Sequence, residues 1–445
     1  MKSQSGLRTT SKERMEMKST ARLLSFFSIM MMAVPLVHAD VLPGDLINES
    51  NVRKIEGLVP DFVVEWVKKG DLTMKIGELA YEPADFLPPE FKDKSNAGRY
   101  KVVENNALKD AKTGELSPNP RTVKGWPFPV IDANDPTAPL QFLHNFNYKE
   151  YVRFPLTTRD YWLVINRKGL EDNYTIRIQK TLFPEGYEYE QGEVSVFEAP
   201  FEVANIANMS CNFMDPVRTG IRYVYAPQLR RVKRLSYRLA GSEETLGTDF
   251  APDDCWAGGP KTAFDEGRYQ MLREQVALVP YLHGSPGSAV ISENGEIDTG
   301  FAKAGNRAYV GYETDGWEGA PWHITNVIWV KRPVYVFEGR SENKNYRYGP
   351  FECWWEKGTF THVYKRDTDI NGTLWKGIYY VHRVMESDDG GFRDVDFIGP
   401  IVVDMKSDRA TTIVANCMEG LYYTRNYSKV NYKHFTRSGF VKFTK

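Results

Sequence analysis

The chain has 445 residues, of which 42% are apolar and 26% charged, and its formal net charge is −1. These values are typical of a folded protein and exclude wholesale disorder. The balanced charge gives no general attraction to nucleic acid. Aromatic residues reach 13%, an excess that favours sheet faces and amphipathic binding surfaces over a helical bundle. The length allows two or three ordinary domains or one large β domain.

A secretory signal peptide is predicted at residues 1–39. Lys18 and Arg22 precede the apolar run 23–37, and small or aliphatic residues occupy the −3 and −1 positions before Asp40. This pattern predicts export and cleavage after Ala39. An uncleaved anchor is the alternative, but about 15 apolar residues are short for a membrane span of about 20. The mature protein, residues 40–445, is therefore expected to be soluble.

The first part of the mature chain, residues 40–157, is predicted to be helical and rich in proline. Pro60 suits the start of a helix that carries an apolar stripe and ends at Gly70. From 83 to 139 the prolines are too dense for a helix or a central strand. Trp126 and its apolar neighbours favour an ordered wrap over a sheet rather than a disordered linker.

A second helix is predicted from Asp135 toward Phe154, because apolar residues recur there on one face. His144 lies on that face and is interpreted as a packing residue rather than a ligand.

Residues 158–419 are predicted to form one large, curved antiparallel sheet. The expected strands are short runs rich in β-branched and aromatic residues, several with clean alternation of apolar and polar side chains. They are 161–165, 174–181, 194–198, 221–225, 232–239, 327–330, 334–338, 346–348, 351–355, 360–365, 373–384, 397–404 and 411–415. Turn chemistry separates them, notably Lys331-Arg332-Pro333 and Asn371-Gly372.

All four cysteines, Cys211, Cys255, Cys353 and Cys417, follow the predicted cleavage site. An even number in an oxidising compartment indicates two disulfides, with three possible pairings. The pairs Cys211–Cys255 and Cys353–Cys417 are favoured because each closes a loop within one half of the chain. The absence of C-x-x-C spacing and of a nearby His argues against a zinc site.

The tail, residues 420–445, holds six Lys or Arg, no acid and many aromatic residues. It is suited to peripheral contact with anionic lipid headgroups or an acidic partner. The alternative interpretation is a solvated edge strand with a short helix.

Motifs for catalysis or metal binding are weak. Asp367-x-Asp369-x-Asn371-Gly372 matches half of a calcium loop, but Ile378 stands where a bidentate Glu is required, so a hairpin turn is favoured. Asp253 and Asp254 could supply paired carboxylates for glycoside cleavage but are interpreted as cap or turn residues. No nucleophile elbow, P-loop or dinucleotide fingerprint occurs, so no catalytic residue, metal or cofactor is assigned.

Several segments resemble a proteobacterial exported family of uncharacterised function that is similar to outer-membrane lipoprotein-sorting proteins. They are Gly125-Trp126-Pro127-Phe128-Pro129, Ile131-Asp132, Asp135-Pro136, Val334–Arg340, Tyr346-Arg347-Tyr348 and Asn371-Gly372-Thr373-Leu374-Trp375-Lys376. The resemblance covers most of the mature chain. This chain is much longer than the small lipoprotein-localisation carriers, and its four cysteines are not general to them.

The resemblance implies an α+β, mainly antiparallel fold: an incomplete β-barrel with helices over its open face. The carriers hold acyl chains in an aromatic-lined concave interior, and members of the family are often associated with transporters of the resistance-nodulation-division type. A periplasmic location and a hydrophobic ligand are therefore expected. The residues expected to line the interior are Trp162, Tyr223, Tyr225, Trp329, Tyr335, Phe337, Trp355 and Trp375.

Three hypotheses follow. The first is a periplasmic carrier for a lipid, a lipoprotein acyl chain or another hydrophobic molecule that works with an envelope transporter. The second is a structural or adaptor subunit whose sheet has a solid core. The third, an enzyme acting on an envelope polymer, has no specific motif in its favour.

Overall fold

The computed structural model describes residues 40–215, 218–236, 242–255, 267–293, 296–299, 307–415, 422–424 and 430–444. Residues 40–445 form one compact unit. The predicted signal peptide, residues 1–39, lies outside the described residues. Among those described, no helix is long and apolar enough to cross a membrane.

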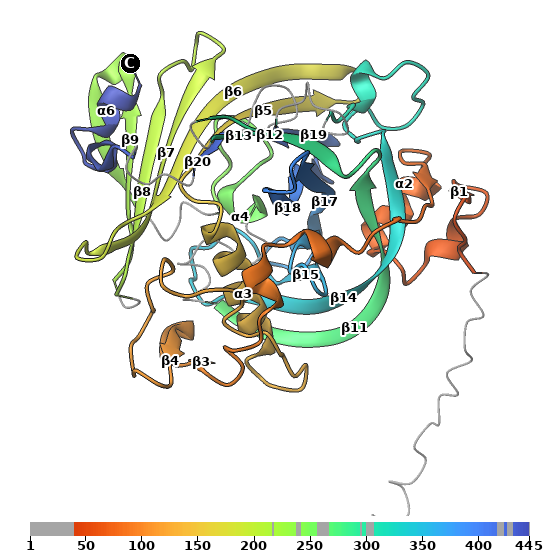
Figure 1. Ribbon diagram of the computed structural model, residues 1–445. Coiled ribbons are helices and arrows are strands. Elements are labelled where there is room, and N and C mark those ends of the chain that lie inside the picture. The colour runs from red at the N-terminus through yellow and green to blue at the C-terminus, as the bar shows by residue number, and fades with distance from the viewer. Residues whose placement is uncertain are drawn as a thin grey trace, which may run out of the picture. The chain divides into compact units, whose positions relative to one another are not determined.

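A large, strongly curved sheet forms the body of this unit (Figure 1). Its strands are β5 (Leu156–Asn166), β6 (Gly169–Leu182), β7 (Tyr189–Ala199), β8 (Ala207–Phe213), β9 (Ile221–Ala226), β10 (Arg231–Leu235), β11 (Gly267–Leu282), β12 (Gly287–Ile291), β13 (Glu296–Asp298), β14 (Val327–Ser341), β15 (Phe351–Glu356), β16 (His362–Thr368), β17 (Leu374–Ser387), β18 (Arg393–Asp404), β19 (Arg409–Ala415) and β20 (Tyr422–Thr424). This mainly antiparallel architecture with few helices confirms the predicted fold class.

The spatial order of the strands divides the sheet into two arms. The first arm runs outward from β5 through β6, β7, β8 and β9 to β10. The second arm runs from β5 through β19, β18, β17, β16, β15 and β14 to β11. All of these neighbours are antiparallel. The end of β11 returns to β17, where Tyr281 pairs with His382 in parallel, so the second arm curls back on itself.

One predicted break is wrong. Lys331-Arg332-Pro333 does not separate two strands, because β14 continues through it without interruption. Proline lacks the N–H that a ladder requires, but β15 pairs with β14 only from Val334 onward. Pro333 therefore lies where β14 has no second neighbour. Tyr346–Tyr348, predicted as a strand, lies in the loop before β15.

The helices are few and short. They are α2 (Asp61–Lys68), α3 (Ala138–Tyr151), α4 (Pro252–Cys255) and α6 (Phe440–Phe443), with 3-10 turns η1 (Val52–Ile55), η2 (Pro83–Phe86), η3 (Pro89–Lys92), η4 (Glu104–Asn106), η5 (Pro227–Leu229), η6 (Gly311–Glu313) and η8 (Tyr432–Phe435). Two small hairpins complete the chain, β1 (Leu46–Ile47) with β2 (Met74–Lys75), and β3 (Tyr100–Val102) with β4 (Leu108–Asp110). The two helices predicted before residue 157 are confirmed as α2 and α3.

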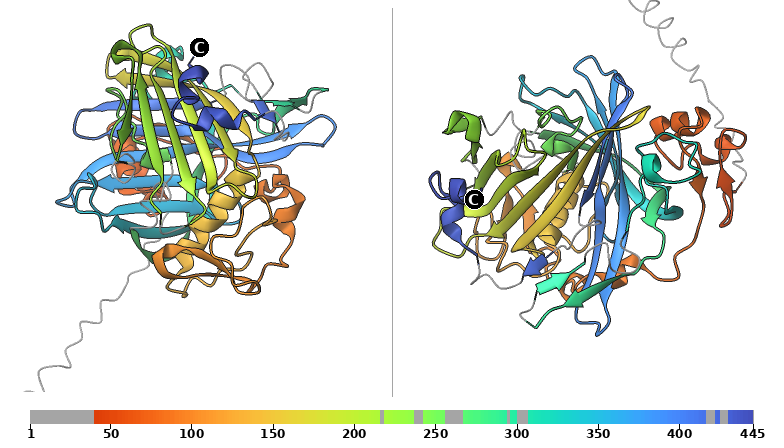
Figure 2. Two further views of the ribbon diagram at one scale, coloured as in Figure 1. Left: turned by 90° about the vertical axis from the view of Figure 1, so that its left-hand side faces the viewer. Right: turned by 90° about the horizontal axis from the view of Figure 1, so that it is seen from above.

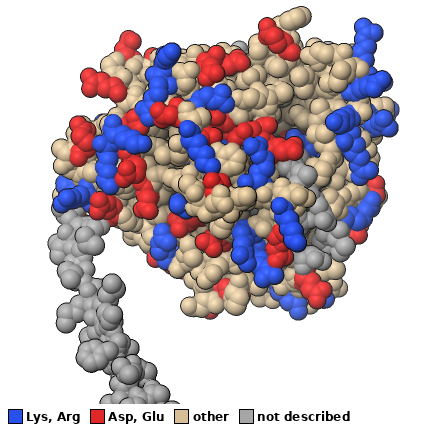
Figure 3. Space-filling model, turned by 180° about the vertical axis from the view of Figure 1, so that it is seen from behind, with Lys and Arg blue, Asp and Glu red and all other residues tan. Residues whose placement is uncertain are grey.

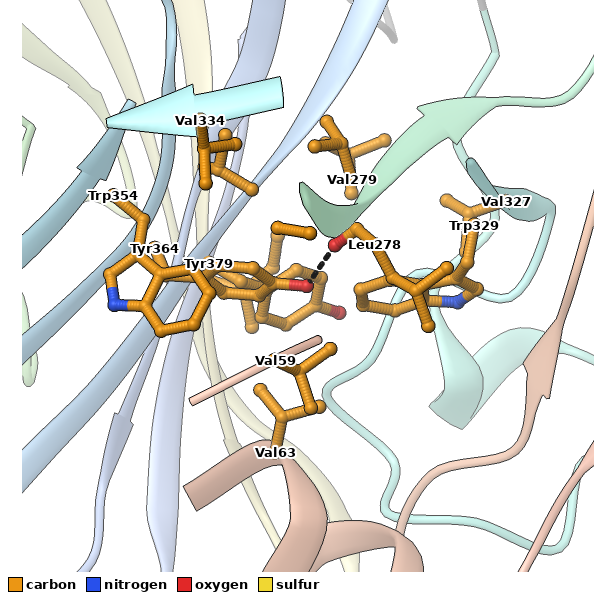
Figure 4. Packing of buried hydrophobic residues seen from close by; sticks show 14 of the residues in the cluster. Val59, Val63, Leu278, Val279, Val327, Trp329, Val334, Trp354, Tyr364 and Tyr379 are labelled. Atoms are coloured by element: carbon orange, nitrogen blue, oxygen red, sulfur yellow. Dashed lines mark hydrogen bonds between the residues drawn. The ribbon is translucent and has the colours of Figure 1, made fainter. Parts of the chain in front are cut away.

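The α2 helix covers one face of β15, β16 and β17. Phe62 and Trp66 pack edge-on against Tyr364 and Tyr379, with ring centroids 6.3 and 6.0 Å apart. A Cβ on Gly377 would lie 2.8 Å from Phe62, so glycine allows the helix to sit this close. Figure 4 shows further residues of the same buried cluster, among them Val63 of α2, Tyr364 and Tyr379, with the hydrogen bond from the Tyr364 hydroxyl to the Leu278 carbonyl.

The α3 helix and the segment 242–255 lie on the opposite face of the second arm, between the two arms (Figure 2). Phe250, in that segment, shares a buried cluster with Ile176 of β6 and Tyr380 of β17. The α3 helix is buried nearly all round, Asn145 and Lys149 included. It is therefore an internal element rather than a surface helix.

The cysteine predictions need correction. Cys211 and Cys353 are buried and neither forms a disulfide, and Cys417 lies outside the described residues. Cys211 belongs to the apolar cluster of the first arm, whereas Cys353 lies in the main core of the second arm. Burial raises the pKa of the Cys211 thiol to about 12. Both thiols behave as small core residues.

Candidate functional site

Two of the aromatic residues predicted to line a ligand cavity contact α3, and a third packs against one of these two. Tyr335 stacks on Phe142 with ring centroids 4.2 Å apart, and Trp355 meets Phe146 edge-on at 5.0 Å. Phe337 lies 5.9 Å from Trp355 and is fully buried. The protein's own helix therefore occupies the space beside these rings.

Three more lie in separate clusters. Trp329 packs with Tyr379 on the α2 side, at 6.0 Å. Trp162 contacts Phe250 edge-on at 4.7 Å. Trp375 packs against the loop that precedes β15. These rings do not converge on a common space.

Tyr223 and Tyr225 lie on the outer face of the first arm, in the cluster that the C-terminal residues close. The opposite face of β7 and β8, which faces the space between the arms, presents Ser195, Asn208 and Ser210 as half-buried side chains. This part of the inner surface is polar, so the aromatic content of the sequence does not mark it.

An acidic segment, residues 242–255, covers the second arm beyond α3. Its Asp253 and Asp254 are fully buried. Both lie in the first turn of α4, where Asp254 Oδ2 accepts a hydrogen bond from the Ala251 N–H at 2.8 Å, which agrees with their prediction as cap or turn residues. Lys376 of β17 lies 3.3 Å from Asp254 Oδ2 and 3.1 Å from Glu244 Oε1. The Nζ of Lys365 donates to the Asp253 carbonyl at 3.1 Å. Ion pairs thus hold the segment to the sheet.

The carboxyl groups of this ionic cluster titrate abnormally. Burial raises the pKa of Asp253 to about 7, although the charge of Lys365 and a hydrogen bond from Tyr346 oppose the shift. Burial likewise raises the pKa of Asp367 to about 6 against the attraction of Lys365, 3.1 Å away. These groups therefore change charge between pH 5 and 8.

The region that resembles a calcium loop is a hairpin turn. Asp369 Oδ1 accepts hydrogen bonds from the backbone N–H of Asn371 and Thr373, and Asp369 pairs with Lys406 at 2.8 Å. Asp367 instead points into the ionic cluster. No group of three or more His, Cys, Asp or Glu among the described residues is arranged to hold a metal ion.

A pocket of about 660 Å³ lies beside the beginning of β14. Its volume falls in the range of about 300–1,000 Å³ that is typical of ligand sites. It is lined by Val41, Leu42, Pro43, Ile76, Gly77, Glu78, Leu79, Ala80, Tyr81, Glu82, Val330, Lys331 and Arg332. Most of this lining is apolar, and the charged side chains come from both ends of the 78–82 segment and from β14.

Local backbone pairing builds this pocket. Ile76 bridges to Trp329 in parallel, and the N–H of Gly77 donates to the Trp329 carbonyl at 3.0 Å. A Cβ at position 77 would lie 3.0 Å from the side chain of Ile328. Glycine thus allows the chain to run along β14 and to form one wall of the pocket.

Arg332 connects the pocket to the protein core. Its Nε donates to Glu356 Oε1 at 2.6 Å, and its Nη1 donates to Glu82 at 3.0 Å. Glu356 is fully buried, whereas the Glu82 side chain is 52% exposed. The guanidinium is therefore held between the buried carboxylate of Glu356 and the solvent-exposed carboxylate of Glu82.

Glu356 is the centre of a buried polar network. Its Oε2 accepts hydrogen bonds from Tyr281 at 2.9 Å and from Thr359 at 2.7 Å, and His382 Nδ1 lies 3.4 Å away. Burial alone would raise the pKa of Glu356, but His382, Arg332 and Thr359 lower it to about 2. A permanently charged carboxylate therefore orients Arg332 at the pocket.

Neither the residues that line this pocket nor Glu356 behind it were predicted from the sequence as site residues. The Lys331-Arg332 pair was predicted as part of a turn. Two adjacent charges inside a long apolar β run could instead have indicated a functional site on a continuous strand. Glu356 ends an aromatic strand, and nothing local shows that it will be buried.

Three solved structures are similar to this chain, each over 64% of its length. One is a domain from Vibrio parahaemolyticus, provisionally described as an outer membrane lipoprotein-sorting protein, with 13% identity, 91% of its length covered and a TM-score of 0.42. A DUF1329 family protein from Desulfovibrio piger has 14% identity, 90% coverage and a TM-score of 0.42. A LolA superfamily protein from Nitrosomonas europaea has 14% identity, 93% coverage and a TM-score of 0.37.

No curated protein matches the chain. The family whose description is "protein of unknown function (DUF1329)" matches residues 46–440. This match spans nearly the whole of the compact unit, and the chain therefore belongs to the DUF1329 family.

Proposed function

We propose that this protein is an exported, periplasmic carrier that binds a lipid, a lipoprotein acyl chain or another hydrophobic molecule and works with an envelope transporter. The observation that supports the proposal best is the pocket beside β14, whose lining is mostly apolar with a few charged groups. Such a lining suits a ligand with a hydrocarbon part and a polar head.

The apolar residues of the pocket supply the affinity in this proposal. Leu42 is 58% exposed, whereas Val41 and Ile76 are buried beneath it. An acyl chain that covers Leu42 and Leu79 would remove their surfaces from water, and each buried methylene contributes about 0.8 kcal/mol. A short hydrocarbon segment is therefore sufficient for useful binding.

The charged residues supply orientation. Lys331 is partly exposed and makes only a long ion pair of 3.4 Å with Asp40. Arg332 is held in place by Glu356. A carboxylate or phosphate head would therefore meet two cations on β14, one mobile and one fixed, while its chain lies along the apolar wall.

The direct test is titration of delipidated protein with a fluorescent fatty acid. Saturable binding is expected. A double variant, Leu42→Glu with Leu79→Glu, places two charges in the apolar wall and is expected to weaken binding at least about tenfold. Leu116→Glu is the matched control, because Leu116 is 51% exposed and lies outside the pocket.

The fatty alcohol of the same chain length tests the polar end. Lys331→Ala is expected to weaken binding of the acid but not of the alcohol. If neither compound nor a lysophospholipid binds saturably, or if the Leu42 and Leu79 changes have no effect, the pocket is not a carrier site. A structural or adaptor role with a filled core would then be the better account.

A further inference from the structure

A basic surface lies where the edge strand β10 meets the C-terminal segment. It is formed by Arg230, Arg231 and Arg437, and four more exposed cations, Lys233, Arg234, Lys433 and Lys442, lie in the same two segments. Arg230, Arg231 and Arg437 line one hollow of about 910 Å³, and no acid is among its lining residues. Within the described part of the chain, none of the seven forms an ion pair.

This gathering of charge is local. The whole chain has a net charge of −1, and Arg218, at the other end of β9, is paired with Glu188 at 2.8 Å. In Figure 3, Lys and Arg side chains gather along the right-hand edge, which is the side of the first arm. A patch of uncompensated cations on a nearly neutral protein marks a surface for a negatively charged partner.

Two exposed apolar side chains lie at the same end of the first arm. Phe201, in the turn between β7 and β8, is 92% exposed, and Leu229, in η5 before β10, is 69% exposed. The two turns are neighbours, because the side chain of Gln228 donates to the carbonyl of Glu202 at 3.1 Å. Leu229 directly precedes Arg230, so these apolar tips border the basic surface.

The C-terminal segment is fixed beneath the surface rather than extended from it. Phe435, Phe440 and Phe443 are buried in the cluster that includes Met209 and Val194. Lys433, Arg437 and Lys442 lie beside that anchor and are exposed.

We propose that this basic surface docks on an anionic phospholipid membrane, with Phe201 and Leu229 entering the headgroup region. Cations bound to anionic headgroups beside protruding apolar side chains are the combination that holds peripheral proteins at a bilayer surface. An acidic protein partner would bind the cations but would not explain why two apolar side chains, Phe201 and Leu229, are 92% and 69% exposed beside them. The proposal goes beyond the ligand pocket and is independent of it.

The test is co-sedimentation of the purified protein with vesicles of phosphatidylcholine alone or mixed with phosphatidylglycerol. Binding is expected only to the mixed vesicles and is expected to fall as salt is added. Each basic residue near such a surface contributes about 1 kcal/mol. The triple variant Arg230→Glu, Arg231→Glu and Arg437→Glu is therefore expected to bind about 100-fold more weakly or worse.

Two further variants make the test specific. Phe201→Ser with Leu229→Ser is expected to reduce binding to the mixed vesicles without removing its salt dependence. Lys94→Glu, Lys101→Glu and Lys112→Glu is the matched control, because these three exposed lysines change the net charge equally but lie in the β3–β4 region. The control is expected to bind like the unaltered protein.

Three results would overturn the proposal. One is equal binding to both kinds of vesicle, and another is an equal loss in the control and the patch variant. The third is no vesicle binding together with capture of polyglutamate that the patch variant loses, which would assign the surface to an acidic protein. Fatty acid titration of the same variants keeps this result separate from the pocket, since their ligand affinity is expected to be unchanged.

Discussion

The α3 helix and the segment 242–255 both lie against the second arm, but they are held there by different forces. The first three turns of α3 contact the sheet through rings, with Phe142 on Tyr335 and Phe146 on Trp355. The acidic segment contacts it through the ring of Phe250 and through ion pairs, in which Lys376 meets Glu244 and Asp254 and Arg409 meets Asp249.

The difference matters for how each element can leave the sheet. An apolar contact loses its whole transfer free energy when it opens, and pH does not change that cost. A buried ion pair is nearly balanced between desolvation and attraction, so protonation or a competing charge can shift it. We call the contacts of Phe142 and Phe146 with the sheet the aromatic seal, and the ion pairs of residues 242–255 with the sheet the ionic seal. The stability of the aromatic seal does not depend on pH, whereas that of the ionic seal does.

The largest effect is expected from truncation of the aromatic seal. Phe146→Ala removes a ring between Trp355 and His362 and is expected to lower the free energy of unfolding by about 4 kcal/mol, mainly through the cavity left behind. Chemical denaturation measures it. Ile370→Ala, at a position 76% exposed, is the control and should stay within about 0.5 kcal/mol. A small loss at Phe146 would mean that α3 is not a core element.

A smaller loss is expected from the ionic seal. Lys376→Met keeps the apolar stem but removes the nearest cation from Asp254 and Glu244, which retain the more distant Lys365 and Arg347 at 3.9 and 3.8 Å. Stability at neutral pH is therefore expected to fall by about 3 kcal/mol. Lys406→Met is the control, since Lys406 is about half exposed and pairs only with Asp369 at the surface. Adding Asp254→Asn to Lys376→Met should restore part of the loss. No restoration would show that the charges are not coupled.

Much of the architecture follows from local pattern. Period-two alternation places the strands of both arms: in β8, buried Ala207, Met209 and Cys211 alternate with half-buried polar residues. Pro60 and Gly70 correctly bracket α2. These features depend on neighbours in sequence, so the sequence alone predicts them.

The candidate site does not follow from local pattern. The pocket joins residues 41–43, 76–82 and 330–332, which only the tertiary fold brings together. Trp355 and Tyr335 have the composition of a ligand wall, but whether a helix fills the space beside them depends on α3, about 200 residues earlier. Burial of Lys376 is equally invisible, because its compensating acids, Glu244 and Asp254, lie in a different segment.

The smallest effect concerns pH and separates the two seals directly. The pKa values of Asp253 and Asp367 are about 7 and about 6 in the folded protein and about 3.9 when unfolded. Between these limits the native state holds protons that the unfolded chain has lost, so these groups favour the folded state at pH 5 and lose that contribution as pH rises to 8. Glu356, whose pKa is about 2, contributes stability that is lost only below about pH 4.5 and so is constant in this window.

Hydrogen exchange, corrected for the intrinsic rate, is therefore expected to show lower protection of residues 249–254 at pH 8 than at pH 5, by on the order of 2 kcal/mol. Residues 140–143 of α3 should change much less, since the ionisable side chains of that helix, His144, Lys149 and Glu150, all follow them in the sequence. Asp253→Asn should flatten most of the difference, because its amide stays neutral throughout. Equal pH dependence of the two segments would mean that they open together, and the distinction between the aromatic seal and the ionic seal would fail.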